Sequence, residues 1–402
     1  MTVEALVEPG AEARVERARP AVLAIPIHLG LLLLGCGGIT LGLLWDISWH
    51  STIGRDTFWT PAHLAIYLGS LLCGACAGHL AWRATFRPAP ALETSSVGIG
   101  RLRAPLGALV MFWGMGTMLT AAGFDNWWHE AYGLDVGILT PAHSLLSTGM
   151  MAVHVGVLML IASSRNRARA GARRRLDSLL LVMTGLTLML ATILLMEFNY
   201  PNLQHGAIFF QVSCAAYPVW LVMIRRASDR RLAATWTATL YTALTLGMLW
   251  ILPLFEARPL LAPIFNQVEH MWPGIFPLLL IVPALLIDLL LPRLERLGAW
   301  GSALVLGAVF AVVFGALQWQ CSEFLLSPAA RNAIFGADQW YFAITHTQEG
   351  IGLERLGDWR YQFWDAAKNP LNFLAGVWIL GLAVLSCRFG LAWGAWMERL
   401  QR

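Results

Sequence analysis

Charged side chains are scarce in this sequence, since Asp, Glu, Lys and Arg make up only 13% of its 402 residues. Hydrophobic residues make up 57%, and the mean hydropathy is +0.60. This composition excludes a soluble domain, which would need a more polar surface. Several apolar runs are long enough to cross a hydrocarbon core of about 30 Å. The sequence therefore predicts an all-α polytopic membrane protein, with the lipid bilayer as its main partner.

The sequence also shows no evident disulfide framework, nucleic-acid-binding module or cleavable signal peptide. Five of the six cysteines lie within or at the ends of apolar segments, so a disulfide framework is not expected. Cys73 and Cys76 have the spacing of a redox pair, but they lie among Gly and Ala, where small residues usually serve close packing. Residues 1–20 are polar, and the apolar run that follows continues into a polar motif, so the first helix should stay in the membrane. No nucleic-acid partner is expected.

The apolar segments predict about ten transmembrane helices, arranged as hairpins that open outward. The segments are 21–45, 62–82, 104–124, 142–163, 178–197, 206–224, 233–255, 274–291, 301–319 and 371–387. If the N-terminus is inside, most Lys and Arg fall in the cytoplasm, as the positive-inside rule requires. Both termini should then be cytoplasmic. The protein would be a multi-pass component of the cell membrane, inner or plasma membrane, with its polar motifs on the extracytoplasmic side.

The chain divides into five expected parts. They are a cytoplasmic tail at 1–20, a four-helix repeat unit of two hairpins at 21–164, further transmembrane helices at 165–319, a long extracytoplasmic loop at 320–370, and a last transmembrane helix with a cytoplasmic tail at 371–402. The long loop is rich in aromatic residues among charges. It is consistent with an amphipathic segment that lies on the membrane and covers the outer sites or contacts a partner, and equally with an interfacial anchor.

One polar motif occurs twice in the four-helix unit, and each copy joins two apolar segments. Each copy has an Asp, a His four residues later, and a second His within a Thr-Pro-Ala-His tetrapeptide. The copies supply Asp46, His50 and His63, and Asp125, His129 and His143. The gap between the two histidines is one residue longer in the second copy. Because each copy lies between two membrane segments, its polar side chains should gather at a membrane surface.

The spacing within each copy suits a metal site. If the first helix persists through His50, then Asp46 and His50 lie one turn apart on the same face. Thr60 and Pro61 are helix-start signals, as N-cap and first helical residue, so His63 falls in the first turn of the returning helix. The positive end of the helix dipole disfavours imidazolium there, which keeps the ring able to bind a metal. The second copy repeats the Thr-Pro signal.

An aromatic belt is the alternative interpretation, because Asp, His and Trp are common at membrane interfaces. An anchor has no reason to reproduce both the identity and the spacing of its polar residues, so the repeat favours metal binding. Ionisable groups at membrane depth are also functional candidates by default. Two His and one carboxylate leave coordination positions open, as in a catalytic site. This ligand set is compatible with copper, non-haem iron and zinc.

Several other polar residues are weaker candidates. Two acids lie between the paired histidines, and two pairs of acid and His lie at the outer ends of later helices: Asp56, Asp135, Glu197, His205, Glu256 and His270. The acids within the motifs are consistent with groups that orient an imidazole and with solvated loop residues. The later pairs lack the complete motif, so they are interpreted as repeat remnants or orienting groups. His28, His79 and His154 each stand alone on an apolar face and are interpreted as packing residues.

The first motif, Asp46-x3-His50-x12-His63, resembles the copper-binding motif in a membrane subunit of the copper membrane monooxygenases, the family of particulate methane monooxygenase and ammonia monooxygenase. The second motif is similar to the neighbouring metal site of that subunit, which has Asn where this chain has Asp125. The resemblance covers about residues 25–164. The family's metal-binding membrane subunit is considerably shorter, so the later helices have no counterpart in it. The chain also lacks a soluble cupredoxin-like domain, so an equivalent of the family's cupredoxin-bearing subunit would be a separate protein or absent.

This resemblance implies a copper-dependent membrane monooxygenase, or its metal-bearing subunit, that activates O2 to hydroxylate a small apolar substrate or ammonia. It also implies companion monooxygenase subunits, a quinol electron donor and a homo-oligomer, since trimers are known in the family. The competing interpretation is a non-enzymatic membrane protein that binds or transports metal. A transporter should continue its ligands through the membrane, and the sequence offers only Cys73, Cys76 and His79 as such a track.

Overall fold

The computed structural model describes residues 26–54, 58–87, 89–133, 140–260, 269–337, 361–363 and 369–402. Within these residues the protein is almost entirely α-helical, and nine helices are long and apolar enough to cross a membrane. The strands among these residues form a two-stranded hairpin. The expected all-α polytopic membrane fold is therefore confirmed. The N-terminal tail at 1–20 lies outside the described residues.

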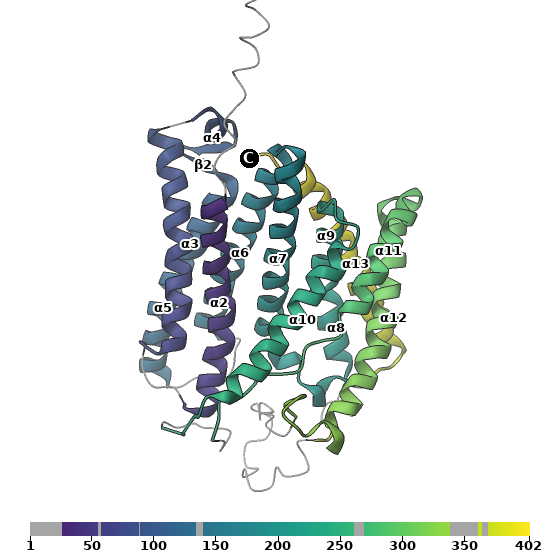
Figure 1. Ribbon diagram of the computed structural model, residues 1–402. Helices are drawn as coiled ribbons and strands as arrows, with labels where there is room; N and C mark the ends of the chain where they lie inside the picture. Colours follow the sequence, from purple (N-terminus) through teal and green to yellow (C-terminus); the bar gives the residue numbers. More distant parts are fainter. Residues whose placement is uncertain are drawn as a thin grey trace, which may run out of the picture.

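The first four long helices form two antiparallel hairpins that stand side by side (Figure 1). They are α2 (Pro26–Thr52), α3 (Pro61–Phe86), α5 (Leu106–Tyr132) and α6 (Pro141–Arg167). The connection from α3 to α5 consists of the short helix α4 (Pro90–Thr94) and the antiparallel strands β1 (Ser96–Ile99) and β2 (Leu102–Pro105). Because α3 also packs against α5, the two hairpins form one four-helix unit.

Glycines let the two helices of each hairpin approach closely. A Cβ atom added at Gly114 of α5 would lie 2.8 Å from the carbonyl oxygen of Gly149 on α6. A Cβ atom added at Gly35 of α2 would lie 2.9 Å from the carbonyl oxygen of Gly69 on α3. Larger residues would therefore push the backbones apart. Close contacts between small residues are a main source of helix association in lipid, where burial of apolar surface gives little drive.

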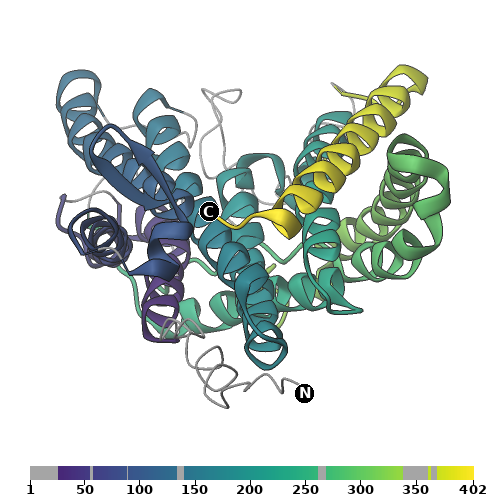
Figure 2. The same cartoon turned by 90° about the horizontal axis from the view of Figure 1, so that it is seen from above.

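The remaining helices form a second group, with α7 lying between the four-helix unit and α12 and α13 (Figure 2). They are α7 (Ala170–Leu194), α8 (Ala207–Ala216), α9 (Pro218–Ala227), α10 (Ala233–Ile251), α11 (Ile281–Leu294), α12 (Gly298–Leu326) and α13 (Phe373–Arg399). Short 3-10 helices are η1 (Met196–Phe198), η2 (Pro201–Leu203), η3 (Leu252–Leu254), η4 (Glu295–Leu297) and η5 (Pro328–Ala330). Together α8 and α9 occupy the sixth expected span, which a proline divides at Pro218.

The prediction of an eighth helix at 274–291 is wrong for its first part. Residues 271–280 are not helical, and α11 begins only at Ile281. Pro273 has no amide proton for a helical hydrogen bond, and Gly274 has a φ of +83°, outside the helical region. Apolar composition alone suggested a span here, but these two residues keep the backbone from forming one.

Polar side chains from neighbouring helices hold this non-helical segment inside the protein. Ser48 Oγ of α2 donates to the carbonyl oxygen of Trp272 at 2.7 Å. The Tyr241 hydroxyl of α10 accepts a hydrogen bond from the amide of Leu278 at 3.0 Å. Non-helical backbone at membrane depth requires such partners, because lipid offers none. The segment thereby connects the end of α2 with the second helix group.

The long loop expected at 320–370 starts later than expected, because α12 continues to Leu326. Residues 338–360 and 364–368 of this loop lie outside the described residues. Most of the expected amphipathic segment falls within these two ranges. The described part includes Phe363, which returns to pack on the helical core.

Arginines gather at the helix ends opposite to the two Asp-His-His motifs. α3, α6, α9 and α13 carry arginine in their last turns, whereas the motif acids lie near the ends of α2 and α5, which run antiparallel to α3 and α6. Arg165 is buried, and its Nε lies 2.6 Å from Asp177 Oδ1 while its Nη2 lies 2.8 Å from Asp229 Oδ1. The molecule therefore has an arginine-rich face and, at the other end, a motif face that carries Asp46 and Asp125.

Candidate metal centres

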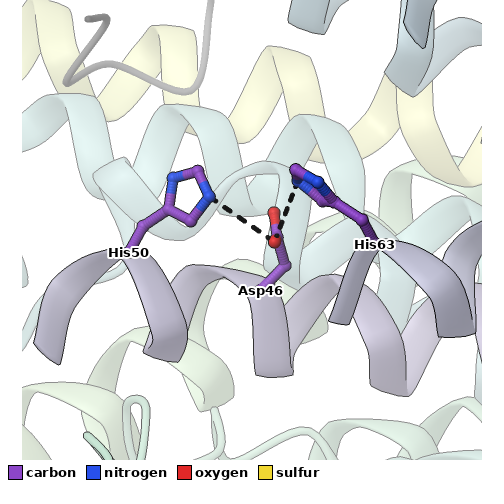
Figure 3. A group of neighbouring side chains, drawn as sticks. All are labelled: Asp46, His50 and His63. Carbon is purple, nitrogen blue, oxygen red and sulfur yellow. Dashed lines mark ion pairs between the residues drawn. The ribbon is translucent and has the colours of Figure 1, made fainter. Parts of the chain in front are cut away.

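The first motif brings its three polar side chains together at the motif face (Figure 3). Asp46 and His50 come from the end of α2, and His63 comes from the first turn of α3. Asp46 Oδ1 lies 3.1 Å from His63 Nε2 and 3.6 Å from His50 Nε2. One ligand atom from each residue lies within 4.8 Å of the other two. Both imidazoles thus approach the same carboxylate oxygen.

The second motif forms the same arrangement in the second hairpin. Asp125 and His129 come from the end of α5, and His143 comes from the first turn of α6. Asp125 Oδ1 lies 3.1 Å from His129 Nε2 and 3.2 Å from His143 Nε2. The three ligand atoms again lie within 4.8 Å of one another. The two sets of three residues are here called the first and the second triad.

Local helix signals position the returning histidine of each triad. Thr60 Oγ1 accepts a hydrogen bond from the amide of His63 at 3.1 Å, and Thr140 Oγ1 accepts one from the amide of His143 at 3.2 Å. Each Thr is the N-cap of its helix and is followed by proline. α2 and α5 also continue past the first histidine of each motif, as the spacing required. The expected N-caps and helix ends are confirmed.

Backbone carbonyl groups fix the orientation of one imidazole in each triad. His63 Nδ1 lies 3.2 Å from the carbonyl oxygen of Phe58, and His129 Nδ1 lies 3.0 Å from that of Gly133. A carbonyl oxygen can only accept, so Nδ1 of both rings carries a proton. In the neutral ring, Nε2 then presents a lone pair to the carboxylate. A proton on one ring nitrogen and a free lone pair on the other is the usual state of a metal-binding histidine.

The donor atoms fit a metal ion in both triads. A lone pair that faces a carboxylate oxygen at 3.1 Å is repelled unless a positive charge lies between them. Donors that stand at right angles on one ion, each at about 2.0–2.2 Å, are about 3 Å apart. One metal ion would therefore satisfy two imidazoles and a carboxylate at once. Protonation alone would instead require His63 and His129 to be imidazolium, since their Nδ1 protons are already used by the carbonyl groups.

Each triad is more open on one side than on the other. The exposed fraction of the side chain is 33% for His50 and 28% for His143. It is 13% for His63 and 7% for His129. The less exposed rings are those that backbone carbonyls orient, so a fixed ligand is paired with an accessible one. This asymmetry leaves room for a further ligand beside the more exposed imidazole.

The two triads are close enough to affect each other. The carboxylate of Asp46 interacts electrostatically with His143 as well as with the two histidines of its own triad. This relation depends on how the two hairpins pack, with α2 also in contact with α6, so the sequence contains no signal for it. A positive charge bound in one triad would therefore act on the ligands of the other.

The non-helical segment at 271–280 also contacts the end of α2 that carries Asp46 and His50, a contact that the sequence did not predict. Met271 Sδ lies 3.7 Å from Ser48 Oγ and 3.6 Å from Thr52 Oγ1, on the turns of α2 that carry Asp46 and His50. The sequence did contain one signal for a break in the expected helix, the Pro273-Gly274 pair of this segment. The second helix group therefore supports the end of α2 that supplies two ligands.

The weaker candidates do not form further centres within the described residues. Asp56 and Asp135 lie outside these residues, and four candidates belong to no group of three ligand atoms there: Glu197, His205, Glu256 and His270. His205 is stacked between Trp319 and Phe363, with ring centroids 3.7 and 3.4 Å away. Glu256 and His270 pair through their backbones and are exposed. Glu256 and His270 are therefore neighbours, as expected, but no third metal-ligating side chain in the described residues joins them.

The histidines assigned to packing differ from one another. His154 is buried, with Nε2 at 2.9 Å from Thr40 Oγ1 and Nδ1 at 2.9 Å from the carbonyl oxygen of Met150, so it joins α6 to α2 as a packing residue would. His28 and His79 do not stand alone, because their rings stack with centroids 5.5 Å apart. The sequence could not reveal this pairing, since it joins two helices.

Comparison with protein families, with curated proteins and with solved structures found no match for this chain.

Proposed function

We propose that this membrane protein holds a metal ion in each of its two triads and acts as a copper-dependent monooxygenase, or as the metal-bearing subunit of one. The observation that supports the proposal is the convergence of two imidazoles and a carboxylate in both hairpins. The reaction proposed is the hydroxylation of a small apolar substrate or ammonia with O2. The substrate class, the copper and the reaction come from the resemblance of the two motifs to the copper membrane monooxygenases.

The chain's own residues would bind and orient the metal. A bound copper ion would supply one-electron redox chemistry and a coordination position for O2. Asp46 and Asp125 would each offset part of the positive charge of the ion, while the carbonyl groups of Phe58 and Gly133 hold one imidazole of each triad in place. Iron and zinc fit the same ligands. A lipid-soluble substrate would approach each triad between the apolar helices.

An aspartate at position 125 makes the two triads chemically equivalent. The copper membrane monooxygenases have Asn at this place, which supplies an oxygen but no charge. In this chain both triads have two imidazoles and one carboxylate. Equal ligands and equal charge favour the same metal in both, so we expect the two triads to fill together rather than to select different ions.

The arginine-rich face supports the membrane orientation in the proposal. Lys and Arg are enriched in cytoplasmic loops, which would make the arginine-rich face cytoplasmic and the motif face extracytoplasmic. The membrane is proposed to be the cell membrane, inner or plasma. A quinol electron donor, companion monooxygenase subunits and a homo-oligomer complete the proposal, again by resemblance to the family.

Metal analysis of purified variants tests the function. The full chain should contain two metal ions, one for each triad, and copper in them should give an EPR signal after oxidation. His50→Ala and His129→Ala should each lose one ion, and both should lose oxidation of the substrate. Each variant removes one ligand of a triad and leaves the rest of its helix intact. Loss of metal without loss of substrate oxidation would exclude the enzymatic function.

Thr140→Ala should weaken metal binding at the second triad without removing a ligand. The loss of a Thr N-cap costs about 1 kcal/mol, or about fivefold in affinity if the metal must restore the first turn of α6. A metal titration monitored by EPR measures this change. Thr148→Ala is the matched control, since its hydroxyl bonds only to the carbonyl of Ser144 on the same exposed helix surface. An equal loss in both variants would contradict the positioning role of Thr140.

A non-enzymatic metal-binding or transport function is the second candidate. It is favoured by donors that continue away from the first triad between α2 and α3, where Cys36 of α2 contacts Cys73 of α3 and His28 stacks on His79. The sequence placed donors only on α3, which argued against a path through the membrane. A transporter would move metal into sealed vesicles that contain this protein, and it would do so without substrate or O2.

A further inference from the structure

Two cysteines from different helices meet inside the first hairpin. Cys36 of α2 and Cys73 of α3 are fully buried, and their thiol groups lie close enough to interact with each other. Cys73 Sγ also donates a hydrogen bond to the carbonyl oxygen of Leu32 at 3.8 Å. Because that bond uses the proton of Cys73, the lone pairs of its sulfur are available to Cys36. The two sulfur atoms are therefore adjacent electron-pair donors.

Close helix packing holds this cysteine pair in place. A Cβ atom added at Gly35 would lie 2.6 Å from Cys73 Sγ, so the sulfur lies directly against the backbone of α2. Cys36 precedes Asp46 by ten residues on the same helix, which corresponds to about 15 Å. The cysteine pair is thus distinct from the first triad, although both lie between α2 and α3.

Further donors continue from the cysteine pair toward the arginine-rich face. Cys76 and His79 follow Cys73 on successive turns of α3, and Cys76 is close enough to interact electrostatically with Cys73. The ring of His79 stacks on that of His28 from α2. Packing of small residues explains one cysteine among glycines, but it does not explain soft donors that recur along one helix contact.

The number of donors determines which ions fit the cysteine pair. Apart from the two triads, the described residues hold no group of three His, Cys, Asp or Glu side chains with ligand atoms within 4.8 Å of one another. Zinc in structural sites and iron–sulfur clusters take four protein ligands, so neither fits. Cu(I) is a soft ion that prefers sulfur and is stable with two ligands. Ag(I) shares these properties and has no redox chemistry here.

We propose that Cys36 and Cys73 form a two-coordinate site for Cu(I) within the membrane. On binding, the S–H bond of Cys36 breaks, a copper–sulfur bond forms and the proton leaves to water, while Cys73 donates a sulfur lone pair. One positive ion replaces one proton, so the site stays neutral and no net charge is buried among apolar side chains. No electron is transferred. The site does not depend on metal in the triads or on the proposed function.

A Cu(I) titration of the full chain tests this site. The protein, carrying His63→Ala and His143→Ala to weaken both triads, is reduced and titrated with Cu(I) without oxygen, in competition with a chromogenic Cu(I) chelator. We expect one Cu(I) ion to bind with ultraviolet absorption from sulfur-to-copper charge transfer. Cys73→Ser and Cys36→Ser should each lower the affinity by about 100-fold or more, since each removes one of two ligands. Ag(I) should compete for the same site.

Cys76→Ser is the matched control, because it changes the same residue type on the next turn of α3. It should alter the affinity less than about threefold, since Cys36 pairs with Cys73 and not with Cys76. Equal losses in Cys73→Ser and Cys76→Ser would overturn the proposal, as would unchanged binding in Cys73→Ser. Recovery of Cys36 and Cys73 as a disulfide from protein kept without oxygen would also overturn it. Circular dichroism and gel filtration establish that each variant is folded, and Cys73→Ala provides a second test with an apolar residue.

Discussion

Replacing Asp46 and Asp125 together by alanine should abolish the metal binding that we propose for the two triads. In each triad the carboxylate oxygen is the atom that both imidazoles approach, at 3.1 to 3.6 Å. Its loss takes away one ligand and the negative charge that opposes the ion. We expect the affinity to fall by more than about 100-fold, because even residues that only orient a ligand contribute 10–100-fold. Metal content after dialysis against a weak chelator measures the change.

Asparagine variants separate the effect of the carboxylate charge on metal affinity from the effect of losing an oxygen ligand. Asp46→Asn and Asp125→Asn retain an oxygen donor without its charge, so they should bind more weakly than the original chain and more tightly than the alanine variants. His270→Ala is the control, since this exposed histidine belongs to no triad. Retention of both metal ions in the double alanine variant would exclude the triads as metal sites.

Replacing Arg165 by methionine should cause the largest loss of stability. Arg165 and Asp177 are both almost fully buried, and Arg165 Nε lies 2.6 Å from Asp177 Oδ1. Methionine has a similar length but no charge, so Asp177 would remain buried without its cation. Breaking a buried ion pair on one side costs about 3–5 kcal/mol. The midpoint of denaturant unfolding in detergent, followed by circular dichroism, measures the loss.

Arg173→Met is the matched control for the buried arginine. Arg173 Nε lies 2.6 Å from Asp229 Oδ2, but the exposed side-chain fractions are 35% and 56%. Such exposed pairs contribute about 0–1 kcal/mol, so this variant should unfold almost as the original chain does. Similar losses in the two variants would contradict the importance of burial. Arg165 lies about 33 Å along α6 from His143, so metal affinity should be unchanged in folded Arg165→Met.

Local features of the triads were readable from the sequence. The i, i+4 spacing of Asp46 and His50 needs only a continuous helix, and α2 runs through both residues. The Thr-Pro signal depends on the hydrogen-bonding of the first helical turn, and Thr60 caps α3 as expected. Both are decided within one or two turns of backbone, where few residues determine the geometry.

The non-helical segment at 271–280 shows why hydropathy was insufficient. An apolar run predicts burial in the membrane, and this segment is largely buried. Its backbone conformation depends instead on Pro273 and Gly274 and on distant partners such as Ser48 and Tyr241. Those partners satisfy the backbone groups that a helix would have satisfied internally. Their positions follow from the packing of helices that are remote in the sequence.

By itself, the sequence determined the membrane class, the two hairpins and the six residues of the triads, because hydropathy, helix periodicity and helix capping act over short stretches of chain. Only the tertiary structure decided that the two triads interact, that Cys36 meets Cys73, and that His28 stacks on His79. Each of these contacts joins different helices. Their geometry depends on how closely backbones pack, which glycines such as Gly35 permit but do not specify.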